Sequence, residues 1–411
     1  MMEYGLIGEK LSHSFSKELH TKYFELDYSL VELKPQEVGE FLQNKNFKAI
    51  NVTIPYKQTV IPYLDGISDV AKNIGAVNTI VNKNGKLYGF NTDFLGLRAM
   101  IEKTGAELLD KNVLILGDGG TSKTALAVAN ALGCKSVFRV SRKGTQNTIS
   151  YEQAKTLTNT HFIINTTPVG MYPKLGGTAI DISVFPNLEG VFDAVYNPLC
   201  SQLVIQAEKR GIIACGGLYM LIAQGVFAAE RFTDTTIEKN KIDSIYNDIY
   251  KLKENIVLVG MPASGKTTVG KLLAKKLGRK FVDTDELIVE KYGNITAIFE
   301  SVGESGFREI ESAVIKEVSA LQSCIIATGG GAILRDENID FLKQNGRIYF
   351  IDRPLEQLVG TADRPLSQNA QALKKRYEER YQIYCDCCDK RVISNTTPND
   401  AVLRIQEDFY K

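Results

Sequence analysis

The feature that most constrains this chain is a phosphate-binding loop motif in its second half. The stretch from Asn255 to Thr268 reads N-I-V-L-V-G-M-P-A-S-G-K-T-T, which places the pattern G-x-x-x-x-G-K-T at Gly260 to Thr267. An apolar run of strand length precedes the loop and a helix-prone run follows it, the order found in a P-loop. Because backbone N–H groups of such a loop hold phosphate oxygens, the motif predicts a nucleotide-binding α/β unit.

The side chains of this loop have predicted roles in binding ATP. We expect Lys266 to reach the β- and γ-phosphates and the Thr267 hydroxyl to ligate Mg²⁺. The predicted ATP-binding residues in the loop are Gly260, Ala263, Ser264, Gly265, Lys266, Thr267 and Thr268. The alternative is a glycine-rich turn before an ordinary helix, and the Lys-Thr pair and the preceding strand argue against it.

The length and composition limit the classes of protein to consider. The chain has 411 residues, more than one hydrophobic core usually organises, so we expect two or three domains. Lys and Arg total 49 and Asp and Glu total 48, a balance that argues against a nucleic-acid or membrane-surface partner. No secretion signal or transmembrane span is visible. Monomer and homodimer both stay open.

The seven cysteines indicate where the protein works. They are odd in number and scattered along the chain, which favours reduced thiols in the cytoplasm over a disulfide framework. Cys385, Cys387 and Cys388 form C-x-C-C, but no histidine lies nearby to complete a zinc site, so we expect no metal there.

The first 250 residues alternate short apolar runs with helical patterns. The first runs are Tyr4 to Ile7, Ser29 to Leu33 and Ala49 to Val52, and this alternation predicts a mostly parallel α/β sheet. The pattern restarts at Asn112 to Leu116, where a strand leads into a G-x-G-G turn and an Ala-rich helix. This turn is typical of a Rossmann-like phosphate site, although it departs from G-x-G-x-x-G.

The next strand of this second unit ends in a basic turn. Ser141, Arg142 and Lys143 stand where an NAD-preferring site places a carboxylate for the ribose hydroxyls. Two cations suit a 2′-phosphate, so the sequence favours NADP over NAD. A solvated basic turn is the alternative.

Polar clusters precede the Rossmann-like unit, at Ser12 to Ser16, Asn51 to Lys57, Gly75 to Thr79 and Gly89 to Asp93. Each has an ordinary structural reading: Ser16 and Asp93 could be helix N-caps, and Asn78 could be a turn residue. Their combination is more informative than any one cluster.

The combined motifs resemble the shikimate dehydrogenase family over roughly residues 1 to 250. They read, in order, H-S-F-S, N-V-T-I-P-Y-K, G-A-V-N-T, G-F-N-T-D, G-D-G-G-T-S-K, N-T-T-P-V-G-M, V-Y-N-P and G-L-Y-M-L-I-A-Q. The resemblance implies that the substrate is bound by Ser14, Ser16, Thr53, Lys57, Asn78, Asp93, Tyr196 and Gln224. It implies NADP contacts from Gly117, Asp118, Gly119, Gly120, Thr121, Ser141, Arg142, Lys143 and Gly217.

The same resemblance makes Lys57 and Asp93 the catalytic pair. Hydride transfer to a ring ketone puts negative charge on the carbonyl oxygen, which a nearby ammonium stabilises and protonates. Asp93, if close, would keep the lysine charged and orient a substrate hydroxyl. We also expect the apolar run from Leu218 to Phe232 to be a helix that returns to the first subdomain.

The residues after the P-loop resemble shikimate kinase over 255 to 411. Asp283 and Asp285 stand at the end of a predicted strand, where alternation puts both side chains on the same face. The stretches that follow are I-F-E-S-V-G-E-S-G-F-R-E-I-E, T-G-G-G, R-P-L and E-R-Y-Q-I-Y. The resemblance implies substrate binding by Asp285, Arg308, Gly330 and Arg380. It also implies that Asp283 holds Mg²⁺ and orients the attacking hydroxyl, and that Arg364 closes on a lid over the phosphoryl group and ATP. The alternatives are a surface salt bridge for Arg308 and a solvated helix face for Arg380.

These observations predict an α/β protein of two parts. Residues 1–252 form a dehydrogenase, with a substrate subdomain (1–100 plus 216–252) and an NADP-binding Rossmann subdomain (101–215). Residues 253–411 form a P-loop kinase with a parallel sheet of the nucleoside monophosphate kinase type. The predicted function is NADPH-dependent reduction of 3-dehydroshikimate followed by MgATP-dependent phosphorylation of shikimate. The alternatives are a quinate-type dehydrogenase joined to a kinase for another small polyol acid, and an ATP-dependent regulatory or motor module with an idle dehydrogenase.

Overall fold

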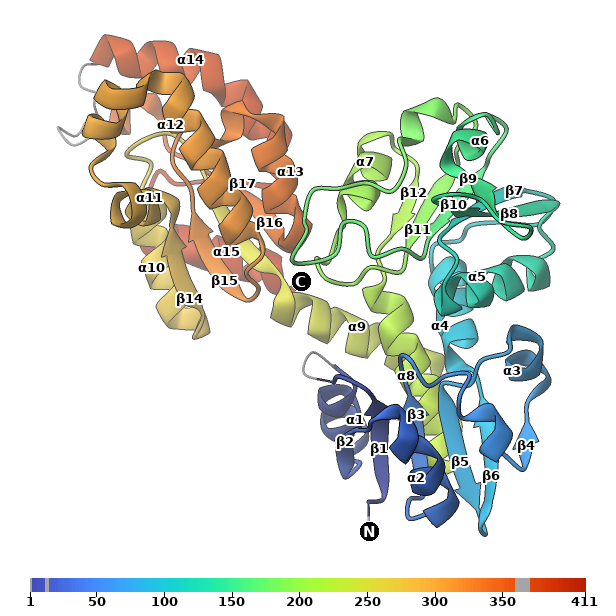
Figure 1. The fold of residues 1–411 in the computed structure, drawn as a ribbon. Coiled ribbons are helices and arrows are strands. Elements are labelled where there is room, and N and C mark those ends of the chain that lie inside the picture. Colours follow the sequence, from blue (N-terminus) through green and yellow to red (C-terminus); the bar gives the residue numbers. More distant parts are fainter. Residues whose placement is uncertain (1, 12–14, 359–369) are drawn as a thin grey trace. The chain divides into compact units, whose positions relative to one another are not determined.

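The chain forms three β-sheets with helices packed on them (Figure 1). The structure is a computed structural model that describes residues 2–11, 15–358 and 370–411. The chain divides into two compact units. The first comprises Met1–Gly170, Gly177–Asn197 and Gln206–Asp248, and the second comprises Met171–Gly176, Pro198–Ile205 and Ile249–Lys411. The first unit contains two of the sheets and the second contains the third; the boundary after residue 252 stays a prediction.

The first sheet has the strand order β2-β1-β3-β5-β6-β4. Its strands are β1 (Tyr4–Gly8), β2 (Tyr28–Glu32), β3 (Ala49–Val52), β4 (Gly66–Ile67), β5 (Thr79–Lys83) and β6 (Lys86–Phe90). As predicted for a mostly parallel sheet, β1 pairs in parallel with β2 and β3, and β4 with β6, whereas β5 runs antiparallel to both β3 and β6. The two-residue turn Asn84-Gly85 explains the pairing of β5 with β6, because its φ angles of 55° and 80° are those of a hairpin turn that matches the twist of the strands.

The second sheet is parallel throughout, in the order β12-β11-β10-β7-β8-β9. Its strands are β7 (Asn112–Leu116), β8 (Ser136–Ser141), β9 (Ile149–Ser150), β10 (Phe162–Asn165), β11 (Gly190–Asp193) and β12 (Ile213–Cys215). Because parallel strands end at the same edge, the loops after β7, β8, β10 and β11 gather there.

The helices up to residue 253 are α1 (Ser16–Phe24), α2 (Val38–Asn44), α3 (Asp69–Ile74), α4 (Thr92–Lys103), α5 (Gly120–Ala131), α6 (Tyr151–Lys155), α7 (Gln202–Lys209), α8 (Leu218–Thr233) and α9 (Lys239–Lys253). Helix α8 packs along α4 and against β3 and β5 of the first sheet, as the run from Leu218 to Phe232 predicted. Gly96 of α4 permits this packing, since a Cβ there would lie 2.6 Å from the carbonyl oxygen of Met220.

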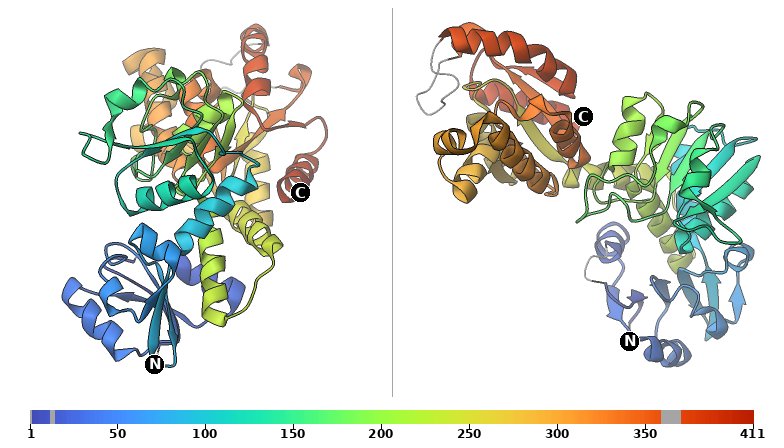
Figure 2. Two further views of the ribbon diagram at one scale, coloured as in Figure 1. Left: turned by 90° about the vertical axis from the view of Figure 1, so that its right-hand side faces the viewer. Right: turned by 45° about the horizontal axis from the view of Figure 1, so that its top comes forward.

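The third sheet, drawn in yellow to red in Figure 2, is parallel, and its strand order is β14-β15-β13-β16-β17. Its strands are β13 (Asn255–Val259), β14 (Lys280–Asp283), β15 (Cys324–Ala327), β16 (Gly346–Asp352) and β17 (Lys390–Ile393). The helices around it are α10 (Lys266–Leu277), α11 (Thr284–Tyr292), α12 (Ile295–Ser319), α13 (Asp336–Asn345), α14 (Ala370–Cys387) and α15 (Pro398–Tyr410).

The central strand β13 is buried on both faces. Val257 and Val259 belong to one hydrophobic cluster with residues of α12 and α14, whereas Ile256 and Leu258 belong to another with residues of α10 and α15. This strand positions the P-loop at its carboxyl end. No helix in the described part of the chain is both long enough and apolar enough to cross a lipid bilayer.

Candidate active sites

A cavity of about 570 Å³ in the first unit collects most of the residues predicted to bind the dehydrogenase substrate. The predicted residues that line it are Ser16, Thr53, Lys57, Asn78, Asp93, Thr121, Tyr196, Gly217 and Gln224. They come from the start of α1, the segment after β3, the residue before β5, the first turn of α4, the first turn of α5, the segment after β11, and α8 with its N-cap. Ser14 lies outside the described residues.

Lys57 and Asp93 form an ion pair in this cavity, with 2.6 Å between Nζ and Oδ2. Their side chains are 25% and 18% exposed, so water screens the pair less than it screens a surface salt bridge. Asp93 lies in the first turn of α4, where the helix dipole favours a carboxylate. Lys57 is fixed at its main chain, because its carbonyl accepts a hydrogen bond of 2.8 Å from the N–H of Val77.

Asn78 is buried and ties the start of α4 to the sheet. Its Nδ2 donates to Thr92 Oγ1 over 3.0 Å, and its Oδ1 accepts from the N–H of Thr92 over 2.7 Å. Asn91, the N-cap of α4, accepts from the N–H of Phe94. Asn78 therefore holds the helix that carries Asp93, in addition to lining the cavity.

Tyr196 and Gln224 line the cavity from the segment after β11 and from α8. Burial raises the pKa of the Tyr196 phenol, so it stays a neutral hydroxyl that can donate and accept. The Nε2 of Gln224 donates to the Leu221 carbonyl over 2.8 Å, which leaves its amide oxygen as an acceptor.

Asn51 is a cavity residue to which the sequence analysis assigned no role. It accepts a hydrogen bond of 2.7 Å from the buried Tyr28 hydroxyl and donates to Thr79 Oγ1 over 3.2 Å. Its place two residues before Thr53, on the same side of an extended chain, was the available signal.

The Rossmann-like turn leaves the start of α5 open for an anion. Gly117 has φ +116°, and a Cβ there would lie 2.6 Å from Thr166 Oγ1, so the tight turn after β7 needs glycine. Gly119 is the N-cap and no side chain caps the helix, while Gly119 and Gly120 face open space. The first N–H groups of α5 are therefore placed to hold a phosphate.

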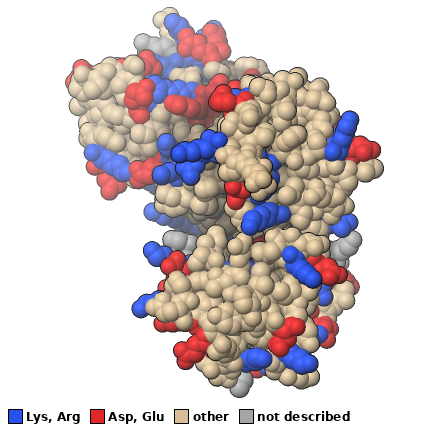
Figure 3. All heavy atoms as spheres, turned by 45° about the vertical axis from the view of Figure 1, so that its right-hand side comes forward, with Lys and Arg blue, Asp and Glu red and all other residues tan. Residues whose placement is uncertain are grey.

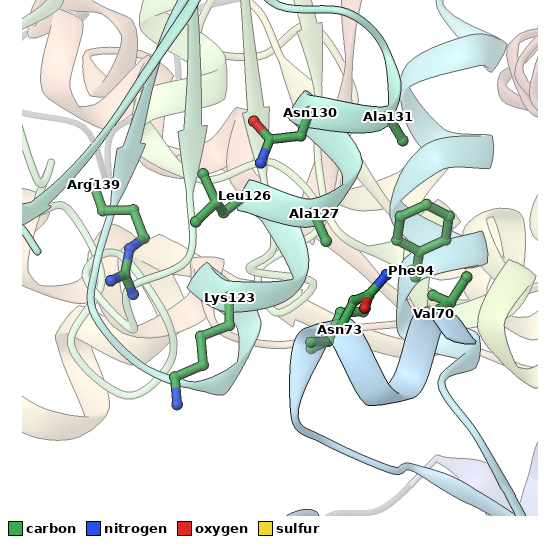
Figure 4. A pocket seen from close by; sticks show the side chains of 10 residues that line it. Val70, Asn73, Phe94, Lys123, Leu126, Ala127, Asn130, Ala131 and Arg139 are labelled. Carbon is green, nitrogen blue, oxygen red and sulfur yellow. The ribbon is translucent and has the colours of Figure 1, made fainter. Parts of the chain in front are cut away.

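Arg139 on β8 is a second residue that the sequence analysis missed. Its Nη1 lies 3.0 Å from Oδ1 of Asp118 in the glycine-rich turn, which offsets the one carboxylate of that turn. A cavity of about 580 Å³ alongside α5 is lined by Arg139, Lys123 and mostly apolar side chains of α3, α4 and α5 (Figure 4).

The basic turn after β8 has two exposed cations. Arg142 and Lys143 pair with no carboxylate among the described residues, whereas the Ser141 hydroxyl lies 2.7 Å from Thr148 Oγ1. Lys143 and Arg139 line one cavity of about 640 Å³ there. The residues present thus fit a phosphorylated ribose.

The P-loop in the second unit has the backbone geometry of a phosphate cradle. Gly260, Ala263 and Gly265 have φ angles of +151°, +64° and +92°. A Cβ at Gly260 would lie 2.7 Å from the carbonyl oxygen of Ile351, so this position requires glycine. No side chain caps the N-terminus of α10 at Gly265, and its N–H groups are available to an anion.

Lys266, Thr267 and Asp283 lie together at this loop. The Lys266 ammonium is buried and donates to the carbonyls of Gly260 and Met261 over 2.9 and 3.0 Å. Thr267 Oγ1 donates to Oδ2 of Asp283 over 2.8 Å. The other oxygen of Asp283 caps α11 through the N–H groups of Asp285 and Glu286.

One hydroxyl and one carboxylate fit Mg²⁺, which keeps several waters and takes its remaining ligands from phosphates. Across residues 2–11, 15–358 and 370–411, no group of three or more His, Cys, Asp or Glu side chains forms a metal cluster. All seven cysteines are free thiols.

The predicted substrate residues of the second unit converge on the T-G-G-G loop after β15. Arg380 Nη1 donates to the Gly330 carbonyl over 3.0 Å. A Cβ at Gly331 would lie 2.1 Å from Arg308 Nη1, and one at Gly329 would lie 2.5 Å from Asp285 Oδ1. The glycines therefore make room for these side chains.

The guanidinium group of Arg308 contacts a buried carboxylate, that of Glu311. Arg308 Nη1 lies 2.6 Å from Oε2 of Glu311, which is buried, and Nη2 lies 3.2 Å from Glu304. Burial raises the pKa of Glu311, although Arg308 opposes this. The pKa of Arg376 is lowered by burial and by the neighbouring charges of Arg380 and Arg308. Such a cluster of cations suits an acid.

The sequence analysis did not name Glu311 or Arg376. Glu311 follows Arg308 by three residues on α12, a spacing that puts the two side chains on one helix face and was the available signal. Arg364 lies outside the described residues.

Two family models match the chain. The model described as "Shikimate dehydrogenase substrate binding domain" matches residues 6–80, and the one described as "Shikimate kinase" matches residues 262–409. Among curated proteins, "Shikimate dehydrogenase (NADP(+))" of Clostridium beijerinckii is 35% identical over 261 residues, which are 59% of this chain and 96% of that protein. The protein of the same name from Methanosphaera stadtmanae is 38% identical over 56% of this chain and 91% of its own length.

Solved structures similar to this chain are also shikimate dehydrogenases. Shikimate dehydrogenase 1 from Peptoclostridium difficile is 36% identical, with a TM-score of 0.55 over 61% of this chain and 98% of that one. A chorismate mutase/shikimate 5-dehydrogenase fusion protein from Clostridium acetobutylicum is 34% identical, with a TM-score of 0.58 over 61% and 97%. The chain therefore belongs to the shikimate dehydrogenase family and carries a shikimate kinase domain in its C-terminal part.

Proposed function

We propose that this bifunctional enzyme of the shikimate pathway reduces 3-dehydroshikimate to shikimate with NADPH and phosphorylates the 3-hydroxyl of shikimate with MgATP. The observation that carries the proposal is the union, in one polypeptide, of a cavity containing the Lys57–Asp93 pair and a P-loop unit with an arginine cluster. The product of the first reaction is the substrate of the second.

In the dehydrogenase unit, Lys57 is the proposed acid. NADPH, when bound, supplies the hydride. The ammonium of Lys57 stabilises the negative charge that develops on the carbonyl oxygen and donates the proton that completes the alcohol. Asp93, at 2.6 Å, orients the ammonium and accepts a hydrogen bond from a ring hydroxyl.

The other polar residues of the cavity orient the ring acid. We assign the hydroxyls of Ser16, Thr53 and Tyr196 and the amides of Asn78 and Gln224 to the substrate's hydroxyls and carboxylate. Ser14 is expected to complete the set.

The proposed cofactor contacts follow the second sheet. The open N-terminus of α5 and the glycine-rich turn, with Thr121, would hold the pyrophosphate, and Gly217 would lie against the cofactor. The exposed Arg142 and Lys143 would bind the 2′-phosphate. The positive charge of these two side chains supports NADP over NAD.

In the kinase unit, positively charged side chains would bind both the ring acid and the nucleotide. We assign Arg308 and Arg380 to the substrate carboxylate, which can accept forked hydrogen bonds from a guanidinium, and Asp285 to ring hydroxyls. The P-loop amides and Lys266 would hold the nucleotide phosphates, with Thr268 at the start of α10.

The kinase reaction replaces one P–O bond with another. The 3-hydroxyl oxygen bonds to the γ-phosphorus, the bond between that phosphorus and the β–γ bridging oxygen breaks to release ADP, and the hydroxyl proton is released to solvent. Asp283 and Thr267 would hold Mg²⁺, which neutralises charge on the phosphates, and Asp283 would orient the hydroxyl. Arg364 is proposed to close over the transferring group.

We further propose a cytoplasmic enzyme without nucleic-acid or membrane partners. On the face seen in Figure 3, Lys and Arg side chains are interspersed with Asp and Glu, in keeping with totals of 49 and 48. The seven free thiols suit a reducing compartment.

The test is to incubate the purified chain with 3-dehydroshikimate, NADPH and MgATP and to follow NADPH oxidation and the phosphorylated product. We expect both, with free shikimate and NADP+ as the products when ATP is omitted. Quinate and shikimate are then offered with NADP and with NAD. Preference for quinate, or no phosphorylated product, would contradict the proposal.

A further inference from the structure

Arg353 lies beside the P-loop and was assigned no role by the motifs. It directly follows β16, which pairs in parallel with β13, the strand that leads into the P-loop, in a register that joins Val259 to Phe350. The two strands therefore end at the same edge of the sheet. The backbone confirms the close approach, since a Cβ on Gly260 would lie 2.7 Å from the carbonyl oxygen of Ile351.

The guanidinium of Arg353 reaches the N-terminus of α10. Its Nη1 lies 4.0 Å from the position that a Cβ would occupy on Gly265, the N-cap of that helix. Gly265 has φ +92° and no side chain, so nothing of its own covers this side of the loop. The cation is thus added to the helix dipole and the loop amides at the same point.

Arg353 has no anionic partner among the described residues. Its Nε is buried, and no described acceptor lies within hydrogen-bonding distance of it. The adjacent Asp352 is taken by Arg391, whose Nη2 lies 2.6 Å away, and by the Tyr381 hydroxyl. The carboxylate of Asp283 is occupied by Thr267 and by the start of α11.

Leaving a buried N–H of a charged guanidinium without an acceptor raises the free energy of the folded protein. An anion bound at the P-loop would remove that cost. P-loop amides hold the α- and β-phosphates of a nucleotide, while Lys266 is placed for the β- and γ-phosphates. Arg353 lies beside Gly265, at the N-terminus of α10. We propose that its guanidinium donates hydrogen bonds to the α- and β-phosphate oxygens of the nucleoside triphosphate that the kinase unit uses.

This inference rests on the proposed kinase function and adds a binding residue to it. The contact is made to phosphates that ATP and ADP share, so it stabilises the ground state and the transition state alike. Loss of such uniform binding raises KM for ATP and leaves kcat nearly unchanged.

The experiment measures MgADP binding by calorimetry and ATP kinetics with shikimate for the full chain and three variants. Arg353→Met removes the guanidinium and keeps an unbranched apolar stem, and Arg353→Lys keeps the charge but loses the two parallel N–H donors of the guanidinium. Lys271→Met is the matched control, because it removes one exposed cation from α10 whose partner is Glu286. The dehydrogenase rate of each variant checks that the chain is folded.

We expect Arg353→Met to weaken MgADP binding and raise KM for ATP by roughly tenfold to 100-fold, Arg353→Lys to give a smaller loss, and Lys271→Met to change both by less than about twofold. Equal effects of Arg353→Met and Lys271→Met would overturn the inference, as would a fall in kcat without weaker MgADP binding. If Arg353→Met does not fold, unchanged MgADP affinity in Arg353→Lys overturns it. A wild-type chain that binds no MgADP contradicts the kinase proposal itself, a different outcome.

Discussion

Lys57 and Asp93 are 36 residues apart in the sequence, yet 2.6 Å separates their charged atoms. The motifs identified both residues, but not what holds them in place. Asn78 anchors the start of α4 and Val77 anchors the Lys57 main chain. Such anchors are hydrogen bonds between distant segments, which no local pattern in the sequence reports.

The role of Lys57 can be tested by truncation. Lys57→Ala removes the proposed proton donor and the cation that stabilises the carbonyl oxygen, so we expect the rate of NADPH oxidation with 3-dehydroshikimate to fall about 100-fold or more. Phosphorylation of added shikimate by the same variant serves as the control and should not change. Wild-type turnover in Lys57→Ala would remove the residue from the mechanism.

His20 gives the first unit a pH-dependent stability. Its ring is buried and stacks on Tyr28, and burial lowers its pKa from 6.5 to about 4. Between these values the unfolded chain binds a proton that the folded chain does not. Stability contributed here is therefore complete above about pH 6.5 and is lost as the pH falls towards 4, by at most roughly 3 kcal/mol.

Denaturant unfolding near pH 7 and near pH 5 measures this loss. We expect His20→Gln to be less stable than the wild type at neutral pH but to lose less stability on acidification. An equal loss in both proteins would contradict the assignment to His20.

Residues whose function depends on a partner were the ones the sequence did not reveal. Arg139 matters because it lies 3.0 Å from Asp118, and Glu311 because it is buried against Arg308. The i, i+3 spacing of Arg308 and Glu311 hints at their pairing, but burial is a property of the folded chain, and the sequence gives no such hint for Arg139 and Asp118.

At the scale of elements, the three sheets differ in how far they could be predicted. The second and third sheets follow the strand–loop–helix repeats that the glycine motifs mark, and both are parallel as expected. The first sheet is mixed, and the Asn84-Gly85 turn explains its antiparallel pair of β5 and β6. An Asn-Gly pair between alternating apolar residues is a hairpin signal, and giving it weight would have predicted this antiparallel pair.

The packing of α4 on α8 positions residues of the cavity from both helices. Gly96→Ala would place a methyl group 2.6 Å from the Met220 carbonyl, so the helices must separate. We expect a loss of about 1–3 kcal/mol in unfolding free energy and a higher KM for 3-dehydroshikimate, because α4 carries Asp93 and α8 carries Gln224.

Arg98→Ala provides the matched control for that variant, since this side chain is exposed on the same helix and pairs with Glu102. It should change stability by no more than about 0.5 kcal/mol. Equal stability and KM in Gly96→Ala and the wild type would show that the helix contact is not tight.

At the scale of the whole molecule, the two units have separate cores and separate sites. Lys266→Ala removes the P-loop ammonium, so we expect phosphorylation to fall below detection while the reduction of 3-dehydroshikimate proceeds at the wild-type rate. Shikimate should then accumulate in the presence of MgATP. A slower reduction would show that the dehydrogenase depends on an intact P-loop.

Free diffusion of shikimate between the sites is the expectation for such a chain. A competing shikimate kinase added to the coupled reaction should capture shikimate in proportion to its own activity. Capture well below that proportion, with the competitor shown to be active under the same conditions, would indicate direct transfer.

In the proposed kinase site, the Gly330 carbonyl limits how that glycine can bind the ring acid. A carbonyl oxygen has two lone pairs, and here the guanidinium of Arg380 and the hydroxyl of Tyr384 both donate to it. Only the N–H of Gly330 is left for recognition, so the group opposite it must be an oxygen that accepts. An analogue carrying an ammonium at that position would find no acceptor at Gly330 and should be discriminated against.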